Sequence, residues 1–216
     1  MSSKTWLILH KRTVDRFYPK FGKRLFDLVF GVPGLLVLFP FILAIGIIVK
    51  LADGGQVFFR HQRVGKNFRK FYLYKFRTMA PESEKKGLQI TSGEDKRITP
   101  VGRFLRKYKL DELPQLFNVI KGDLSLVGPR PEVEKYVNLF LEDYREILLV
   151  RPGITDFAAI EYRNEEKVLA KYSNVEEGYI KEVLPHKIKL YQKYLEQMSL
   201  TTDLKIIFQT LWSIVK

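Results

Sequence analysis

Two adjacent carboxylates, Asp111 and Glu112, are the residues of this sequence whose types and spacing most directly suit chemistry. Neighbours on a helix point about 100° apart, so the two can do different work. One can attack a substrate phosphorus while the other holds a divalent metal or sets the charge of its neighbour. A simpler interpretation stays open, because acids at the start of a helix often cap backbone N–H groups and suit the helix dipole.

Arginines in rigid turns follow the carboxylate pair. Arg130 lies between two prolines in GDLSLVGPRPE (122–132), and Arg151 opens RPGIT (151–155). Proline fixes the backbone, so Arg130 presents its donors in one direction, which suits a phosphate gripped by two hydrogen bonds. The alternative for either arginine is a surface turn with a solvated side chain.

Four more cations are candidates for binding phosphate or nucleotide. Two share one face of an expected strand within YKFRTM (74–79), although they could also be mere surface charge. Arg103 and Lys107 stand four residues apart on one face of an expected helix, and Arg106 lies beside them. The four candidates are Lys75, Arg77, Arg103 and Arg63.

The pattern as a whole suits phosphoryl transfer. That chemistry needs positive groups around the equatorial oxygens, a metal bridging phosphates and an in-line nucleophile. Mg²⁺ binds through one or two carboxylates plus substrate phosphates, so Asp111 and Glu112 are its expected ligands. The sequence holds no Walker loop and no GxGxxG, GxSxG or HExxH motif, and the corresponding enzyme classes lose support.

The composition fits one folded domain with an anionic partner. The chain has 216 residues, a net charge of +13 and no cysteine, which excludes a disulfide framework and thiolate chemistry. Residues 50–109 hold 16 Lys/Arg against 5 acids, whereas residues 110–150 hold 4 against 8. Lipid headgroups, nucleotide phosphates and nucleic acid would each suit the basic region, and charge alone does not separate them.

A run of 22 uncharged residues, 28–49, is long enough to span a bilayer as a helix. Its length and late start argue against a secretory signal. Pro33 and Pro40 interrupt the run, and Pro40, near the middle, is the expected kink. Basic residues flank both sides, so the positive-inside rule favours a re-entrant helix that leaves by the face it entered. A straight span and a buried hairpin in a soluble core are the alternatives.

Local patterns place the elements around the carboxylates. Two stretches rich in Val, Phe and Tyr, 56–62 and 70–76, predict a β-hairpin with a basic tip. Thr99 followed by proline predicts a helix with threonine as its N-cap. A second helix is expected to start at Asp111, with Pro114 tolerated in its first turn.

Further helices are expected over 132–148, 164–172 and 176–198. The last helix, from Thr202 or Asp203, carries an apolar stripe that suits a core and a membrane interface equally. The stripe consists of Leu204, Ile207, Phe208, Leu211, Trp212 and Val215. Outside these elements, residues 4–22 could form an interfacial segment or a loose arm, and residues 81–97 a polar loop.

In its motifs the chain resembles the bacterial sugar transferase family, the monotopic polyprenyl-phosphate phosphoglycosyl transferases. The match covers about residues 23–153, and the long stretch through the carboxylate pair is its most specific part. Beside the proline-broken run, the matching segments are KRLFD (23–27), FFRHQRVGKN (58–67), YKFRTM (74–79), TPVGRFLRK (99–107), LDELPQLFNVIKGDLSLVGPRP (110–131) and RPGIT (151–155). Their number and order argue against a chance match.

The resemblance implies a reaction in two steps. The aspartate matching Asp111 attacks the sugar-side phosphate of a UDP-sugar, UMP leaves, and undecaprenyl phosphate then collects the phosphosugar. Glu112 matches the family glutamate associated with Mg²⁺, and Arg130 matches the arginine of the family's Gly-Pro-Arg-Pro turn. The implied location is the bacterial cytoplasmic membrane, with the catalytic domain on its cytoplasmic face. The implied role is the first membrane step of exopolysaccharide, capsule or O-antigen synthesis.

The implied fold is α+β and mainly helical, with a re-entrant, proline-kinked membrane helix plus a small helical catalytic domain that contains a β-hairpin. We expect a basic N-terminal arm (1–24), the membrane helix (25–52) and a cytosolic, membrane-associated catalytic domain (53–216). Only 22 residues precede KRLFD, so the chain resembles the catalytic unit of larger relatives. The amphipathic C-terminal helix could mediate a homodimer.

Two positions depart from the family pattern. Phe39 precedes Pro40 where members often have serine, which leaves the stabilisation of the kink open. Asp156 follows Thr155 where many relatives have glycine, a subfamily difference that we relate to the sugar. Two other functions compete: an anchored scaffold, which does not need the catalytic constellation, and a nucleic-acid-binding protein, against which the uncharged run argues. The sequence identifies neither the sugar nor the glycan.

Overall fold

The computed structural model of the chain describes residues 18–80, 95 and 97–215. Residues 1–17, which include most of the expected basic arm and interfacial segment, lie outside the described residues. The same is true of 81–94 and 96, which make up most of the expected polar loop.

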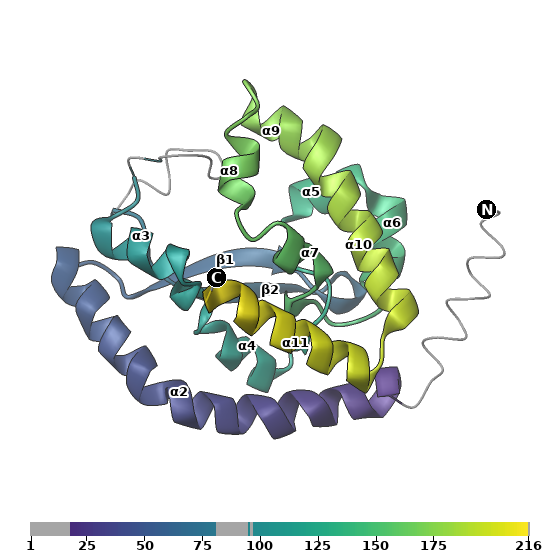
Figure 1. Cartoon of the computed structure of the whole chain (residues 1–216), viewed down its shortest axis with the longest axis horizontal. Coiled ribbons are helices and arrows are strands. Elements are labelled where there is room, and N and C mark those ends of the chain that lie inside the picture. The colour runs from purple at the N-terminus through teal and green to yellow at the C-terminus, as the bar shows by residue number, and fades with distance from the viewer. Residues whose placement is uncertain (1–17, 81–94, 96, 216) are drawn as a thin grey trace.

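One long helix, α2 (Lys23–Asp53), contains the whole apolar run and follows a short π-helical turn, η1 (Tyr18–Gly22). Pro33 and Pro40 both lie inside it, where each removes a backbone donor. Figure 1 shows α2 bending as it passes along one side of the molecule. Within the described residues it is the one helix long and apolar enough to cross a membrane, with a mean hydropathy of 2.7.

The start of α2 is bound to the rest of the protein by polar contacts. Lys23 is buried and forms an ion pair with the fully buried Asp203. Arg24 donates to the carbonyl oxygens of Val119 and Ile120 at 2.6 and 2.7 Å. Two cations of the basic flank are therefore engaged by protein groups, so the flank offers fewer free charges to lipid headgroups than the sequence indicated.

Both halves of α2 lie against the same body of protein. In the first half, Asp27 accepts hydrogen bonds from the Ser125 hydroxyl and the Leu126 N–H at 2.8 and 2.9 Å. In the second half, Ile42 and Val49 are buried in a cluster that also contains residues of the hairpin and of the helix after it. A straight span would carry one end of the helix away from this body, whereas here neither end leaves it.

The predicted β-hairpin is confirmed. Strands β1 (Phe58–Val64) and β2 (Lys70–Phe76) pair antiparallel with Phe58 opposite Phe76, and the turn η2 (Lys66–Phe68) joins them. A second ladder was not predicted: β3 (Ser125–Val127) and β4 (Gly153–Thr155) pair in parallel. Their ends approach closely, because a Cβ on Gly153 would lie 2.1 Å from the Gly128 nitrogen. This ladder brings the two Arg-Pro turns side by side.

Helix α3 (Pro100–Lys107) starts as predicted, with the Thr99 hydroxyl accepting the Gly102 N–H. The helix expected over 132–148 is broken at Phe140, where ψ is 41°. The remaining helices are α4 (Gln115–Lys121), α5 (Glu134–Leu139), α6 (Leu141–Ile147), α7 (Phe157–Glu161), α8 (Glu165–Leu169), α9 (Val175–Gly178), η5 (Tyr179–Val183), α10 (Leu184–Gln197) and α11 (Leu200–Val215). The expected helix over 176–198 thus runs as three consecutive segments.

Helix α11 turns its apolar stripe outward. Asp203 and Ile206 are the residues that it buries, whereas most of the stripe is exposed. Ile207 packs half-buried against the main core, so core packing holds for that member of the stripe and fails for the exposed ones. The exposed members are Leu204, Phe208, Leu211 and Trp212.

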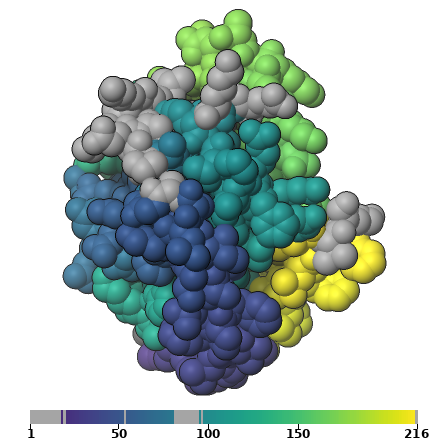
Figure 2. Space-filling view, turned by 90° about the vertical axis from the view of Figure 1, so that its left-hand side faces the viewer, coloured from purple at the N-terminus to yellow at the C-terminus, as the bar shows by residue number. Residues whose placement is uncertain are grey.

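Figure 2 shows α2 as a ridge down one face, with α3 beside it. In this way the apolar helix borders the segment that carries the carboxylate pair.

Candidate active site

The carboxylate pair sits on a short turn between α3 and α4. Lys109 has a left-handed backbone (φ 56°, ψ 20°) and turns the chain into the 3₁₀ segment η4 (Leu110–Glu112). The helix expected from Asp111 starts later, at Gln115. Leu110 and Leu113, which bracket the pair, pack against the cluster that contains Ile42 and Val49 of α2. The pair is thereby held next to the apolar helix.

Asp111 is buried, with 6% of its surface exposed. Its Oδ2 lies 4.0 Å from the Lys75 ammonium, and its Oδ1 has no hydrogen-bond partner among the described residues. No backbone N–H within the described chain bonds to either oxygen, so the capping interpretation is wrong for this residue. Burial raises the pKa of Asp111, and the charge of Lys75 acts in the opposite direction.

Glu112 is held by two cations from different elements. Its Oε1 accepts from Lys75 of β2 at 2.8 Å and from Arg130 Nη2, and its Oε2 accepts from Arg130 Nη1 at 3.2 Å. Burial alone would raise the pKa of Glu112, but Arg130 and Lys75 outweigh it and hold the pKa well below the ordinary value. Glu112 is a fixed anion, whereas Asp111 keeps one oxygen open.

Asp156 holds the turn that carries Arg130. The Arg130 N–H donates to Asp156 Oδ2 at 3.0 Å, while Asp156 Oδ1 caps α7 by accepting the Ala159 N–H at 2.6 Å. The residue that departs from the family pattern therefore has a structural role that the sequence did not reveal. The charge of Glu112 in turn raises the pKa of Arg130.

Two cations near the pair were missed as site residues. Lys109, whose pKa is lowered by burial, is close enough to interact electrostatically with both acids. Arg106, on the last turn of α3, donates to the Thr78 hydroxyl and to Glu166 at 2.9 Å each. Nothing in the helical spacing distinguishes Arg106 from its neighbours, so no sequence signal would have selected it.

Two predicted cations are engaged beside the hairpin. Arg63 pairs with Glu132 at 2.8 Å and thereby ties β1 to the segment after Arg130. Arg77 is buried, and its guanidinium packs against Gly55, where a Cβ would lie 1.7 Å from Nη1. These contacts hold together the elements around the site and do not reach the carboxylates.

The other two predicted cations make no hydrogen bond or ion pair to the carboxylates in the described chain. Arg103 is exposed, and in the part of the chain that the structure describes its side chain makes no hydrogen bond or ion pair. The Arg151 Nε donates to the Gly122 carbonyl at 2.9 Å, at the end of α4. Of the six predicted cations, the structure brings Lys75 and Arg130 to the carboxylates.

The carboxylate pair would need further ligands from a substrate to hold Mg²⁺. Among the described residues no three His, Cys, Asp or Glu side chains converge on one point. Mg²⁺ needs one or two carboxylates when substrate phosphates complete its shell. The unpartnered Asp111 Oδ1 fits that requirement. Glu112 Oε2, with one bond, also has a lone pair left.

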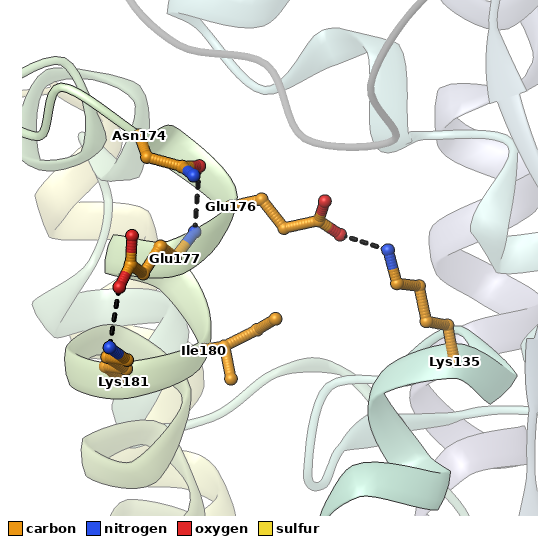
Figure 3. Close-up of a pocket in the computed structure, with 6 residues that line it drawn as sticks. All are labelled: Lys135, Asn174, Glu176, Glu177, Ile180 and Lys181. Carbon is orange, nitrogen blue, oxygen red and sulfur yellow. Dashed lines mark hydrogen bonds and ion pairs between the residues drawn. The ribbon is translucent and has the colours of Figure 1, made fainter.

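A separate surface pocket carries no comparable chemistry. Figure 3 shows its acids meeting lysines: Glu177 pairs with Lys181 at 2.6 Å, and Glu176 pairs with Lys135. Its volume is about 330 Å³. The lining residues are Lys135, Asn174, Glu176, Glu177, Ile180 and Lys181.

A family described as bacterial sugar transferase matches residues 18–216. The chain belongs to the bacterial sugar transferase family. The UDP-N-acetylgalactosamine-undecaprenyl-phosphate N-acetylgalactosaminephosphotransferase of Aeromonas hydrophila is 36% identical to this sugar transferase over 218 residues, covering 96% of the chain and 48% of the relative. The chain thus spans about half the length of that protein.

Two further relatives agree with this membership. The exopolysaccharide production protein ExoY of Sinorhizobium fredii is 33% identical over 205 residues, covering 88% of the chain and 84% of the relative. The UDP-glucose:undecaprenyl-phosphate glucose-1-phosphate transferase of Xanthomonas campestris pv. campestris is 36% identical over 212 residues, covering 94% and 40%. These matches are consistent with the family membership of the chain, and its long apolar helix fits a membrane protein.

Proposed function

We propose that this sugar transferase moves a sugar 1-phosphate from a UDP-sugar to undecaprenyl phosphate through an aspartyl phosphosugar. In the first step an Asp111 oxygen bonds to the sugar-side phosphorus, the bond from that phosphorus to the bridging oxygen breaks, and UMP leaves with that oxygen. In the second step an oxygen of undecaprenyl phosphate attacks the same phosphorus, and Asp111 leaves as a carboxylate. The product is a lipid-linked diphosphosugar, which would begin an envelope glycan.

The observation that carries the proposal is that Glu112 is bound by two cations whereas Asp111 is not. Glu112 is fixed by Lys75 and Arg130, so it is poorly placed to attack phosphorus. Asp111 is buried beside the same lysine and neither of its oxygens is held by a strong ion pair, so one oxygen can attack while the other faces a metal ion. The attack therefore falls to Asp111, while Glu112 stays a fixed anion beside it.

We propose Asp111 and Glu112 as the protein ligands of Mg²⁺. When bound, the ion would neutralise charge on the donor diphosphate and favour the departure of UMP. The residues of the chain do the rest: Lys75 and Arg130 orient Glu112, and Asp111 supplies the attacking oxygen.

The packing of α2 supports a proposal for how the protein meets the membrane. Because both halves of α2 lie against one body of protein, we propose a re-entrant helix whose exposed side meets lipid. The catalytic domain would then lie on the cytoplasmic face, where nucleotide sugars are made. The exposed apolar side includes Val29, Phe30, Leu36, Val37, Phe41, Leu43, Ile47 and Ile48.

The proposed function is tested by UMP release. Protein purified in detergent is supplied with undecaprenyl phosphate and a panel of UDP-sugars, and UMP is measured. We expect release with at least one sugar, loss of release when Mg²⁺ is chelated, and recovery when Mg²⁺ is returned. Absence of UMP across a broad panel would contradict the transferase and leave the anchored scaffold as the better account.

The pH dependence of the reaction should report on Asp111. The residue attacks only when ionised, and burial raises its pKa, so kcat/KM should rise with pH through a value above that of an exposed aspartate. Lys75→Met removes a charge that favours ionisation, and the acid limb of the profile should move to higher pH. Lys70→Met, on the exposed end of the same strand, is the matched control. An acid limb that stays in place in Lys75→Met would contradict this role of the lysine.

A further inference from the structure

Arg106 lies between the carboxylate segment and a helix that no proposed step uses. Its Nε donates to the Thr78 hydroxyl, and its Nη1 donates to Glu166 on α8, both at 2.9 Å. Thr78 is buried and follows Lys75 by three residues, just beyond the end of β2. The guanidinium is thus anchored on one side by a fixed hydroxyl and on the other by a carboxylate.

The two partners of Arg106 differ in how firmly they are held. Thr78 is 6% exposed, and its carbonyl accepts the Thr99 N–H at 3.0 Å, so both burial and a backbone hydrogen bond hold it in place. The Glu166 side chain is 43% exposed and the Arg106 side chain 23%. Ion pairs this open to solvent contribute little to stability, so another anion can displace Glu166 at small cost.

The site needs a positive charge of this kind. Lys75 and Arg130 are both committed to Glu112, and burial disfavours the charged form of Lys109. A donor diphosphate adds negative charge beside Asp111, which must itself be ionised. Helix α3 packs against η4, and the charge of Arg106 partly opposes the burial that raises the pKa of Asp111. Guanidinium suits phosphate because it offers several donors in one plane.

We propose that Arg106 binds a phosphate of the donor, and that Glu166 holds its side chain until the donor displaces the carboxylate. The proposal rests on the function proposed above, because it takes a nucleoside diphosphate as the ligand. It assigns Glu166 a restraining role: the carboxylate competes with the donor and keeps the guanidinium extended when the site is empty. Arg103, three residues earlier on the same helix, lacks any partner in the described chain and should not take part.

Four variants test the proposal by the KM for the UDP-sugar. Arg106→Gln should raise KM about tenfold or more, as expected for loss of a charged hydrogen bond. Glu166→Gln, a change at a half-exposed side chain that should not disturb folding, should lower KM severalfold. In the double variant the effect of Glu166→Gln should vanish, because its target is gone. Arg103→Gln removes the same charge from the same helix and should leave KM within about twofold of the parent.

Binding of UDP, measured calorimetrically on the same variants, separates this proposal from the proposed function. UDP binding requires no turnover, so it tests Arg106 even if the wild-type protein releases no UMP. UMP release by the wild type with equal KM and UDP affinity in Arg106→Gln and Arg103→Gln would overturn the role of Arg106 alone. If Glu166→Gln still lowered KM in the absence of Arg106, the proposed competition between Glu166 and the donor for Arg106 would be overturned.

Discussion

Replacing Asp111 with asparagine is expected to slow UMP release by roughly a thousandfold or more, because an amide cannot form the bond to phosphorus on which the first step depends. The measurement is the single-turnover rate with saturating UDP-sugar and Mg²⁺. The variant should still fold, since Asp111 Oδ1 has no partner to lose and Oδ2 lies 4.0 Å from Lys75.

Thermal unfolding of the Asp111→Asn protein in detergent provides the control. Removal of a buried negative charge with a raised pKa should leave the midpoint unchanged or slightly higher. A variant with a normal unfolding curve that keeps a tenth or more of the wild-type rate would show that the attacking group lies elsewhere.

Replacing Glu112 with glutamine should have the largest effect on stability, about 1–3 kcal/mol of the free energy of unfolding. The change leaves Lys75 and Arg130, whose side chains are 23% and 27% exposed, without the carboxylate that both bind. Activity should also fall, because the two cations lose the anion that fixes their positions beside the substrate. Chemical denaturation in detergent, combined with UMP release, measures both effects.

Glu134→Gln is the matched control for Glu112→Gln. Glu134 pairs with Lys70 at 2.7 Å, but the two side chains are 53% and 46% exposed. An ion pair so exposed should contribute less than about 1 kcal/mol. If the two glutamine variants lost similar amounts of stability, the ion pairs of Glu112 with Lys75 and Arg130 would not hold the site together as described.

The sequence predicted correctly the elements that short-range residue patterns determine. The hairpin was predicted from strand-forming residues around a turn, and α3 from a threonine cap followed by proline, and both are confirmed. The carboxylate pair was selected by residue type and by its motif, and the structure places it in a cationic cluster. The predicted helix start at Asp111 was wrong, because the chain makes a 3₁₀ turn there and α4 begins only at Gln115.

Tertiary packing decided what the sequence could not. Which arginine of α3 contacts the rest of the site depends on how the elements pack, and the sequence does not show this. Arg103 was therefore a candidate, whereas in the structure Arg106, one turn later, contacts Thr78. The parallel ladder of β3 and β4 was invisible because each strand is only three residues long. The role of Asp156 depends on that ladder, which brings it under the Arg130 turn.

The membrane helix illustrates the same limit. The sequence showed its length and its two prolines, and the positive-inside rule predicted a re-entrant helix. That rule treated Lys23 as a free flanking charge, whereas the structure buries it against Asp203. A basic residue beside an apolar run can therefore serve the fold of the domain as well as the orientation of the helix.

The most direct test of the whole account is the mass of the protein after reaction with the UDP-sugar and Mg²⁺ in the absence of undecaprenyl phosphate. We expect the intact protein to gain the mass of one sugar phosphate, located by fragmentation on Asp111 and removed when undecaprenyl phosphate is added. A protein that releases UMP without gaining this mass, or that carries the adduct on another residue, would contradict the assignment of Asp111 as the nucleophile.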